Sequence, residues 1–486
     1  MKKSTIALAI IILVLILFAS LLITNNYLLP QSVPTLTPAS VYVGVTYGGS
    51  NIANAKLLID KVKNYTTLFV IQSGQLEKDH KALTDICKYA INSGLYVIVY
   101  FSAVPTYRQY ISAFLSDAQT LRNGFLGIYF DDEPGGKMLD SQENIYFYDN
   151  LTRTIIEKTP QFLGVIKEDG TLTAYINDGS IEIDGPIHIF YESNTTLSSD
   201  YNSLQLTSAK YIVIPNGTIF IRDDNGTVIS QLTDENTLAK IEPYQQLLNK
   251  KPFQTYDEAA RIYISTVQNS TSWPHSQTST KLFTSDYALY WYDYLGGYDV
   301  ILAELGWNST SEQQIALTRG AANLQDKDWG TIITWKYDQP PYLGNGTEMY
   351  DQMRLAYESG SKYIVIFNYP EYPDNNPYGV LQEDHFEALQ KFWNKTIQNK
   401  QITQGSIKAE DIFILPNNYG WGLRSPQDNI WGLWQADNRS RTIWDNLQNA
   451  IMTYGSHLDI IYDNPLYSYV GKYKQIILWN QTSSKP

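Results

Sequence analysis

Short apolar runs alternate with segments of helical periodicity along most of this chain. The runs are rich in β-branched and aromatic residues and are too short for helices of usual length, so they read as buried strands. Eight such strands are predicted, each followed by a helix, and eight is the number at which a parallel sheet closes into a barrel. The predicted strands are Val41–Tyr47, Thr67–Ser73, Leu95–Ser102, Leu126–Asp131, Lys281–Ser285, Val300–Glu304, Thr331–Trp335 and Tyr363–Asn368.

The rhythm changes in two places. Residues 161–245 carry short alternating runs separated by Asp-Gly and Asn-Gly turn signals, which predicts a small antiparallel β-rich insertion after the fourth strand. Residues 404–486 predict a small α/β domain of three parallel strands. We therefore expect an α/β protein whose (β/α)8 TIM barrel spans residues 41–403, with helices at Ser141–Lys158 and Tyr256–Val267 flanking the insertion.

The start of the chain predicts membrane attachment. Lys2 and Lys3 precede the apolar run Ile6–Ile23, which has about the length needed to cross a bilayer. We interpret residues 1–24 as an uncleaved signal anchor with the lysines in the cytoplasm, and residues 25–40 as a Pro/Thr-rich stalk. The bulk of the chain would then be extracellular. A cleaved signal peptide is the alternative.

Composition narrows the function further. The net charge of −13, with no offsetting Lys/Arg cluster, argues against nucleic-acid binding. The single cysteine, Cys87, fits a buried helical face, and the five histidines show no metal-ligand spacing, so we expect no metal and no cofactor. Asn-x-Ser/Thr sequons behind an export segment suggest a glycosylated surface. They begin at Asn64, Asn150, Asn194, Asn216, Asn225, Asn269, Asn308, Asn345, Asn394, Asn438 and Asn480.

Polar residues follow the predicted strands where each strand ends. The fourth strand runs into Asp131, Asp132 and Glu133, and Pro134-Gly135-Gly136 then predicts a loop. In a barrel, the carboxyl ends of the strands meet at one mouth, where catalytic and binding residues gather. From the other strand ends we expect substrate-binding side chains at Tyr47, Gln72, Asp286, Trp307, Trp335, Lys336, Tyr337 and Asn368.

Carboxylates, amides and aromatic rings at one mouth suit carbohydrate. Cleavage of a glycosidic bond needs one carboxyl group that protonates the leaving oxygen and another that attacks the sugar or activates water. We expect Glu304 to act with Asp132 or Glu133, and alternation near a turn leaves open which of the two faces the mouth. Helix capping or ion pairing is the competing interpretation for each acid. Asp131 is expected to be structural.

The motifs Tyr129-Phe-Asp-Asp-Glu-Pro-Gly-Gly136 and Leu302-Ala-Glu-Leu-Gly-Trp307 resemble those of (β/α)8-barrel glycoside hydrolases. Carboxylates after the fourth and sixth strands are similar to the nucleophile and acid/base of the α-galactosidase-like clan. That clan uses Asp at both places, and this chain has Glu304. The C-terminal domain resembles a truncated amidotransferase-like domain, and the whole chain resembles membrane-anchored archaeal surface proteins with Asp-Glu-Pro-Gly-Gly at this position.

Together these features predict an extracellular, membrane-anchored glycoside hydrolase. Its partners would be an oligosaccharide or surface glycan and, through the N-terminal helix, the membrane. The alternative is a non-catalytic glycan-binding or cell-envelope protein on a glycosidase-like barrel. Carboxyl groups about 5–5.5 Å apart would suit a retaining enzyme and about 6.5–9.5 Å an inverting one.

Overall fold

The computed structural model describes residues 36–103, 107–140, 255–307, 310–370 and 376–481, with the backbone of six strands between residues 162 and 233. The predicted anchor and the predicted helix Ser141–Lys158 lie outside these residues, and so do most of the stalk and the sequon at Asn308. Among the helices that the structure describes, none has the length and apolar character required to span a bilayer.

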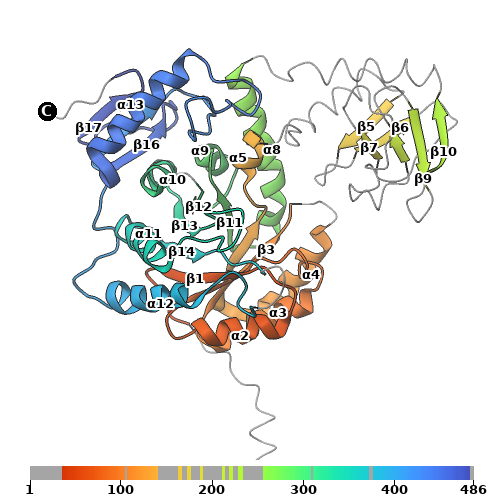
Figure 1. Cartoon of the computed structure of the whole chain (residues 1–486), viewed down its shortest axis with the longest axis horizontal. Coiled ribbons are helices and arrows are strands. Elements are labelled where there is room, and N and C mark those ends of the chain that lie inside the picture. The colour runs from red at the N-terminus through yellow and green to blue at the C-terminus, as the bar shows by residue number, and fades with distance from the viewer. Residues whose placement is uncertain are drawn as a thin grey trace, which may run out of the picture.

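Eight parallel strands close into a barrel whose strands lie side by side in chain order, with a six-stranded insertion between the fourth and the fifth and with the last strand beside the first (Figure 1). This confirms the predicted (β/α)8 TIM barrel, including all eight predicted strands. The strands are β1 (Tyr42–Tyr47), β2 (Leu68–Ile71), β3 (Tyr96–Phe101), β4 (Phe125–Phe130), β11 (Lys281–Asp286), β12 (Val300–Leu305), β13 (Asp328–Ile333) and β14 (Tyr363–Ile366).

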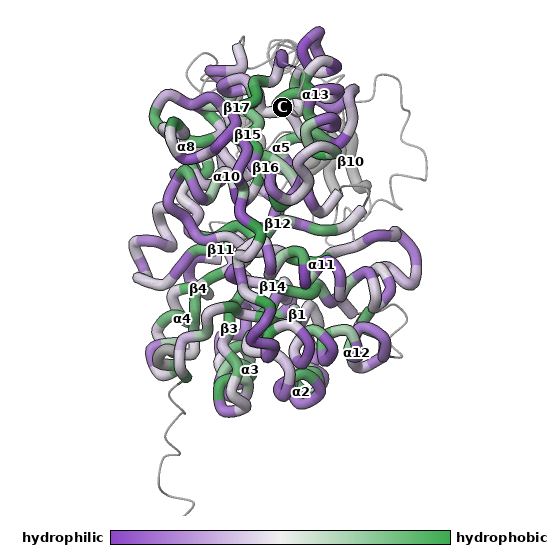
Figure 2. Tube along the Cα trace, turned by 90° about the vertical axis from the view of Figure 1, so that its left-hand side faces the viewer, coloured by the Kyte–Doolittle hydropathy of each residue, from purple (hydrophilic) through white to green (hydrophobic). Residues whose placement is uncertain are grey.

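Helices follow the strands and cover the outside of the barrel. Hydrophobic residues gather along the strands, and hydrophilic residues mark the outer surface of the helices (Figure 2). The helices are α2 (Ile52–Val62), α3 (His80–Asn92), α4 (Arg108–Ala118), α5 (Pro134–Asp140), α8 (Tyr256–Gln277), α9 (Tyr290–Leu295), α10 (Ser311–Gln325), α11 (Gly346–Glu358) and α12 (Glu383–Phe392), with a 3-10 turn at Gln119–Gly124 and a π-helical turn at Trp393–Ile397.

One local prediction was wrong. Pro134-Gly135-Gly136 does not start a loop but forms the first residues of the short helix α5. Proline suits the first helical position because the N–H that it lacks would have no partner inside the helix there.

Side chains fill the interior of the barrel. Along each strand, alternate residues point inward, so a cluster of apolar residues from all eight strands forms a core separate from the one beneath the helices. Its members are Tyr42, Leu68, Val70, Tyr96, Ile98, Tyr129, Phe283, Val300, Leu302, Ile332, Tyr363 and Val365. The barrel is therefore packed through its centre, and its chemistry is confined to the layer above this core.

Two further sheets occur. Between β4 and β11 along the chain, a six-stranded sheet has the order β10-β9-β8-β7-β6-β5. Its pairs are antiparallel except for the parallel pair of β7 and β8, so the expectation of a purely antiparallel insertion was wrong there. The strands are β5 (Phe162–Ile166), β6 (Leu172–Ile176), β7 (Ile187–Ile189), β8 (Tyr211–Val213), β9 (Thr218–Arg222) and β10 (Val228–Thr233).

The C-terminal segment packs on the barrel. Its three parallel strands, as predicted, are β15 (Asp411–Leu415), β16 (Leu458–Tyr462) and β17 (Gln475–Leu478), with helix α13 (Asn438–Tyr454) between the first two and a 3-10 turn at Gly455–His457. They lie beside α10 (Figure 1). Arg319 of α10 donates to Asp459 of β16 over 2.7 Å, and both side chains are almost fully buried. The loop between β15 and α13 also buries three large aromatic side chains, those of Tyr419, Trp421 and Trp431.

Candidate active site at the barrel mouth

The inward-facing positions one step above the barrel core hold the polar residues of the site. Continuing the alternation from Val70, Ile98, Phe283 and Leu302 by two residues reaches Gln72, Tyr100, Ser285 and Glu304. Each lies at the carboxyl end of its strand. The period of a β-strand therefore places a glutamate, a serine and a tyrosine in one layer at the mouth.

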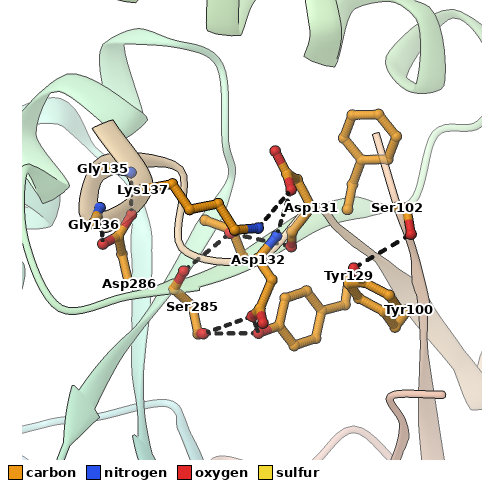
Figure 3. Close-up of polar contacts among 12 residues, drawn as sticks. Tyr100, Ser102, Tyr129, Asp131, Asp132, Gly135, Gly136, Lys137, Ser285 and Asp286 are labelled. Atoms are coloured by element: carbon orange, nitrogen blue, oxygen red, sulfur yellow. Dashed lines mark hydrogen bonds and ion pairs between the residues drawn. The ribbon is translucent and has the colours of Figure 1, made fainter. Parts of the chain in front are cut away.

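Tyr129, Asp132, Ser285 and Glu304 are joined through their oxygen atoms. The Tyr129 hydroxyl contacts Asp132, and it also donates to Ser285 Oγ over 2.7 Å (Figure 3). Ser285 Oγ lies 3.1 Å from Asp132 Oδ1 and 2.7 Å from Glu304 Oε1. The two carboxyl groups thus contact the same hydroxyl. Hydrogen bonds of about 3 Å each limit the distance between their nearest oxygens to about 6 Å.

The turn after β4 holds its acids in an uncommon backbone conformation. Asp131 has φ 62° and Glu133 has φ 52°, both in the left-handed region that disfavours residues with a side chain. The Glu133 N–H donates to the Ser285 carbonyl over 3.0 Å, and the Lys137 N–H donates to the Glu133 carbonyl over 2.8 Å. These bonds fix the turn against β11 and α5, and they bring the Glu133 carboxyl into hydrogen-bond contact with Glu304.

Burial and mutual repulsion raise the pKa values of these carboxyls. Burial and the Asp132 charge raise the pKa of Glu133 to about 7, although its hydrogen bond with Glu304 opposes the shift. Burial, with the Glu133 and Asp132 charges, holds the pKa of Glu304 well above its usual range. Burial also raises the pKa of Asp132. All three carboxyl groups are therefore more readily protonated than carboxyl groups in water.

Lys137 and Asp131 complete the turn. Lys137 Nζ lies 3.4 Å from Asp131 Oδ1, and the same oxygen accepts the N–H of Asp132 over 2.8 Å (Figure 3). These contacts fit the expectation that Asp131 is structural, because its carboxylate binds groups within the turn itself.

The predicted substrate contact of Asp286 does not fit its placement. Asp286 is fully buried, and its carboxylate accepts backbone N–H groups of Gly135 at 2.5 Å and Gly136 at 2.9 Å (Figure 3). It also accepts those of Tyr287 and Ala288. Its neighbour Ser285 faces the mouth instead, since successive strand residues point to opposite sides.

Tyr47 and Asn368 also differ from their predicted roles. Tyr47 packs in the core beneath the helices, and its hydroxyl donates to the Asn51 carbonyl over 2.6 Å. Asn368 is buried, and its Oδ1 accepts the Val380 N–H over 3.0 Å. Both lie on the outward phase of their strands, so they support loops instead of lining the mouth.

The remaining predicted substrate-binding residues differ in their exposure and in the partners that they already contact. Gln72 Nε2 donates to the Tyr129 hydroxyl over 3.3 Å, which links it to the carboxyl network. Lys336 is engaged by Glu348, with Nζ 2.7 Å from each carboxylate oxygen. Trp335 is half-buried against Tyr342 and Phe367. Trp307 and Tyr337 are exposed by 50% and 43%, and Lys336 Nζ lies over the Tyr337 ring, 5.6 Å from its centroid. Exposed aromatic rings of this kind can stack on a ligand.

The predicted site residues do not include Tyr129, Tyr100 and Ser285, which the structure places beside the carboxyl groups of the mouth. Tyr129 and Tyr100 pack edge to face, with ring centroids 5.4 Å apart. Burial and the negative charge of Asp132 raise the pKa of both phenols, so both remain protonated donors. Alternation along each strand could have identified these residues as facing the barrel interior. The sequence does not show, however, which alternate set of residues in each strand points inward.

No group of three or more His, Cys, Asp or Glu residues suited to a metal ion occurs in the part of the chain that the structure describes. The site that these residues do form consists of carboxyl and hydroxyl groups. Such a set can hold and move protons and can place a carboxylate beside an electrophilic carbon.

Comparisons with known proteins give limited information. No protein-family model matches the chain, and no curated protein matches it significantly. Among solved structures, an O-GlcNAc hydrolase mutant of Thermobaculum terrenum aligns at 6% identity and TM-score 0.32, over 74% of this chain and 60% of that one. A 4-O-α-L-rhamnosyl-β-D-glucuronidase of Fusarium oxysporum aligns at 11% identity and TM-score 0.31, over 74% and 73%.

A third similar structure is of another kind. The enoyl reductase domain of MlnA from Bacillus amyloliquefaciens aligns at 9% identity and TM-score 0.25, over 67% of this chain and 53% of that one. At TM-scores this low, the likenesses carry no argument about activity. The barrel assignment rests on the strand order of the chain itself.

Proposed function

We propose that the chain is a glycoside hydrolase that acts on an oligosaccharide or cell-surface glycan at the mouth of its barrel. The observation that carries this proposal is that Asp132 and Glu304 contact one hydroxyl, that of Ser285, while burial and the Asp132 charge raise the pKa of the adjacent Glu133 to about 7. The cluster thus supplies both a carboxyl acid and a second carboxyl group, which are the two groups that glycosidic cleavage requires.

The roles follow from exposure and protonation. Glu304 is only 4% exposed, whereas Asp132 and Glu133 are partly exposed at the mouth. Glu133, whose pKa is raised to about 7, therefore donates its proton to the leaving oxygen. Asp132, which is oriented by Tyr129 and Ser285, attacks the anomeric carbon.

The roles proposed here are those of a retaining enzyme, in which one carboxylate attacks the sugar and the other carboxyl group protonates the leaving oxygen. The exposed rings of Trp307 and Tyr337 would stack on sugar rings beside the carboxyl cluster.

The proposal also includes the location of the protein and its modification. Residues 1–24 would anchor the chain in the membrane, the remainder would face outward, and its sequons would carry glycans. The alternative, a non-catalytic glycan-binding or cell-envelope protein, is favoured by the same exposed rings and differs only in whether the acids act chemically.

The test is hydrolysis of a panel of aryl glycosides and oligosaccharides by the full chain, beside Glu133→Gln and Glu304→Gln. We expect each substitution to lower the rate by about 10²- to 10⁴-fold with folding intact. Glu358→Gln, in a partly buried i,i+4 ion pair at the end of α11, is the matched control. If no substrate is cleaved and calorimetry shows glycan binding that both substitutions leave unchanged, the binding-protein alternative holds.

A further inference from the structure

A sixth carboxyl group lies behind the mouth and takes no part in the proposed chemistry. Asp293 of α9 is fully buried. Its Oδ1 accepts the hydroxyl of Tyr263 over 2.5 Å, but its Oδ2 has no donor among the residues that the structure describes. A buried carboxylate oxygen without a hydrogen-bond donor raises the free energy of the folded chain. The question is therefore whether Asp293 is protonated.

The group that Asp293 meets is another carboxyl, that of Asp286. Asp286 is also fully buried, and its Oδ1 already accepts three backbone N–H groups, those of Gly136, Tyr287 and Ala288. Its Oδ2 accepts only the N–H of Gly135. A carboxylate has about four lone-pair sites, two on each oxygen, so Oδ2 has room for one more donor.

We propose that Asp293 carries a buried proton, which it donates to Asp286, and that this carboxyl pair is the positioning element that sets Glu133 in the mouth. The proton gives Asp293 Oδ2 its missing partner. With the proton on Asp293, Asp286 ionises as the pH rises through its pKa of about 7, and its four N–H donors then stabilise the carboxylate. This inference rests on the proposed function only for its activity readout.

The surroundings of Asp293 favour its protonated form. Burial and the Asp286 charge hold the pKa of Asp293 well above its usual range, and burial raises that of Asp286 only to about 7. The proton therefore belongs to Asp293. The titratable groups that interact with Asp293 are all neutral or negative, and of these the Tyr263 hydroxyl, through its hydrogen bond, favours the charged form: Asp131, Asp286, Tyr263, Tyr290, Tyr294 and Tyr298.

Asp286 transmits this state to the turn. Its contacts hold residues 135 and 136 against β11 so closely that a Cβ on Gly135 would lie 2.7 Å from the Ala288 carbonyl oxygen. Glu133 lies two residues before Gly135, in a left-handed conformation that needs such support. A charged Asp293 would repel Asp286 and shift the turn, and with it the Glu133 carboxyl.

Two asparagine substitutions separate this proposal from a merely structural role. Asp293→Asn keeps the pattern, because its amide can donate to Asp286 and its oxygen can accept from Tyr263. Asp286→Asn breaks it, because its NH₂ opposes backbone N–H donors. We expect Asp293→Asn to retain activity within about twofold and Asp286→Asn to lose about tenfold to a hundredfold, as misplacement of a catalytic group does. Asp293→Leu removes the donor and should resemble Asp286→Asn.

A direct readout does not depend on activity. The infrared difference spectrum of the full chain minus Asp293→Asn, at about pH 8, should contain the C=O band of a protonated carboxylic acid. Absence of that band, or an Asp293→Asn variant that is less stable to urea than Asp286→Asn, would overturn the proposal. If the chain cleaves no glycoside, the spectrum and the unfolding comparison still decide the question, so failure of the two proposals can be told apart.

Discussion

Ser285 Oγ lies 2.7 Å from Glu304 Oε1, although the two residues come from different strands and Glu304 is almost fully buried. The same hydroxyl contacts Asp132, so one serine connects the acids that follow β4 with the acid at the end of β12. In the proposed function this hydroxyl keeps the two carboxyl groups at a fixed spacing.

Removing this hydroxyl should therefore impair catalysis more than folding. We expect Ser285→Ala to lower the hydrolysis rate by about tenfold or more, because Asp132 and Glu304 lose their common partner, and to cost about 1–3 kcal/mol of stability. Rates and urea unfolding measure the two effects. Ser361→Ala is the matched control, since its buried hydroxyl donates to the Tyr363 carbonyl at 2.7 Å, beyond the far end of the barrel. Equal activity losses in both variants would contradict the role of Ser285.

Activity should fall as the pH rises through about 7. Burial and Asp132 raise the pKa of Glu133 to about 7, and above that value the acid form is lost. The pH–rate profile of the full chain tests this, and Glu133→Gln should abolish the alkaline limb together with most of the activity. A profile that stays flat from about pH 5 to 9 would argue against Glu133 as the acid.

Stability, like activity, should fall as the pH rises through about 7. The pKa values of Glu133 and Asp286 are raised from 4.5 and 3.8 to about 7, so the folded chain binds more protons than the unfolded chain. Their contribution is fully present below the unfolded values and is lost as the pH rises through about 7. The free energy of unfolding in urea should therefore be lower at about pH 8 than at about pH 5, and less so in Glu133→Gln. A rise over this interval in the full chain would refute the assignment.

The glycines after Pro134 should not tolerate a side chain. A Cβ on Gly136 would lie 2.1 Å from the Tyr287 ring. We expect Gly136→Ala to cost about 1–3 kcal/mol and to lower activity by moving the turn. Gly74→Ala, where the nearest atom would be the Glu77 carboxylate at 3.3 Å, serves as the control. Thermal unfolding of the two variants distinguishes them, and equal midpoints would contradict the packing at Gly136.

Glycan attachment has a structural requirement that the described sequons meet. The asparagines Asn64, Asn269, Asn345, Asn394, Asn438 and Asn480 are all exposed, whereas Asn368 and Asn446, which lie outside sequons, are buried. Mass spectrometry of peptides from the protein purified out of its own cells should find glycans on several of these six positions. Unmodified peptides at all six would remove the support for a glycosylated outer surface.

Strand phase explains what the sequence could and could not predict. The eight strands were identified because each is a compact β-branched run with clear ends. Glu304 was found because it ends such a run and happens to lie on the inward phase. Tyr47 and Asn368 lie on the outward phase, and no local pattern distinguishes the phases when both faces of a strand are apolar. Ser285 was passed over for Asp286 for the same reason.

Which of the three acids after β4 faces the mouth was harder to predict. Asp131 and Glu133 adopt a left-handed backbone that interrupts alternation, so counting from the strand cannot predict which carboxyl faces the mouth. The contacts of Glu133 come from residues more than a hundred positions later in the chain, Ser285 through its carbonyl and Glu304 through its carboxyl group. Only the closed barrel brings these segments together.

The central claim is that the acid cluster at the mouth cleaves glycosidic bonds, with Asp132 as the attacking group. The most direct measurement is the initial rate at which the full chain and Asp132→Asn release the aryl group from the best substrate of the panel. We predict cleavage by the full chain and a fall of about 10³-fold or more in Asp132→Asn with unchanged unfolding. A folded Asp132→Asn variant that retains the full rate would contradict the account.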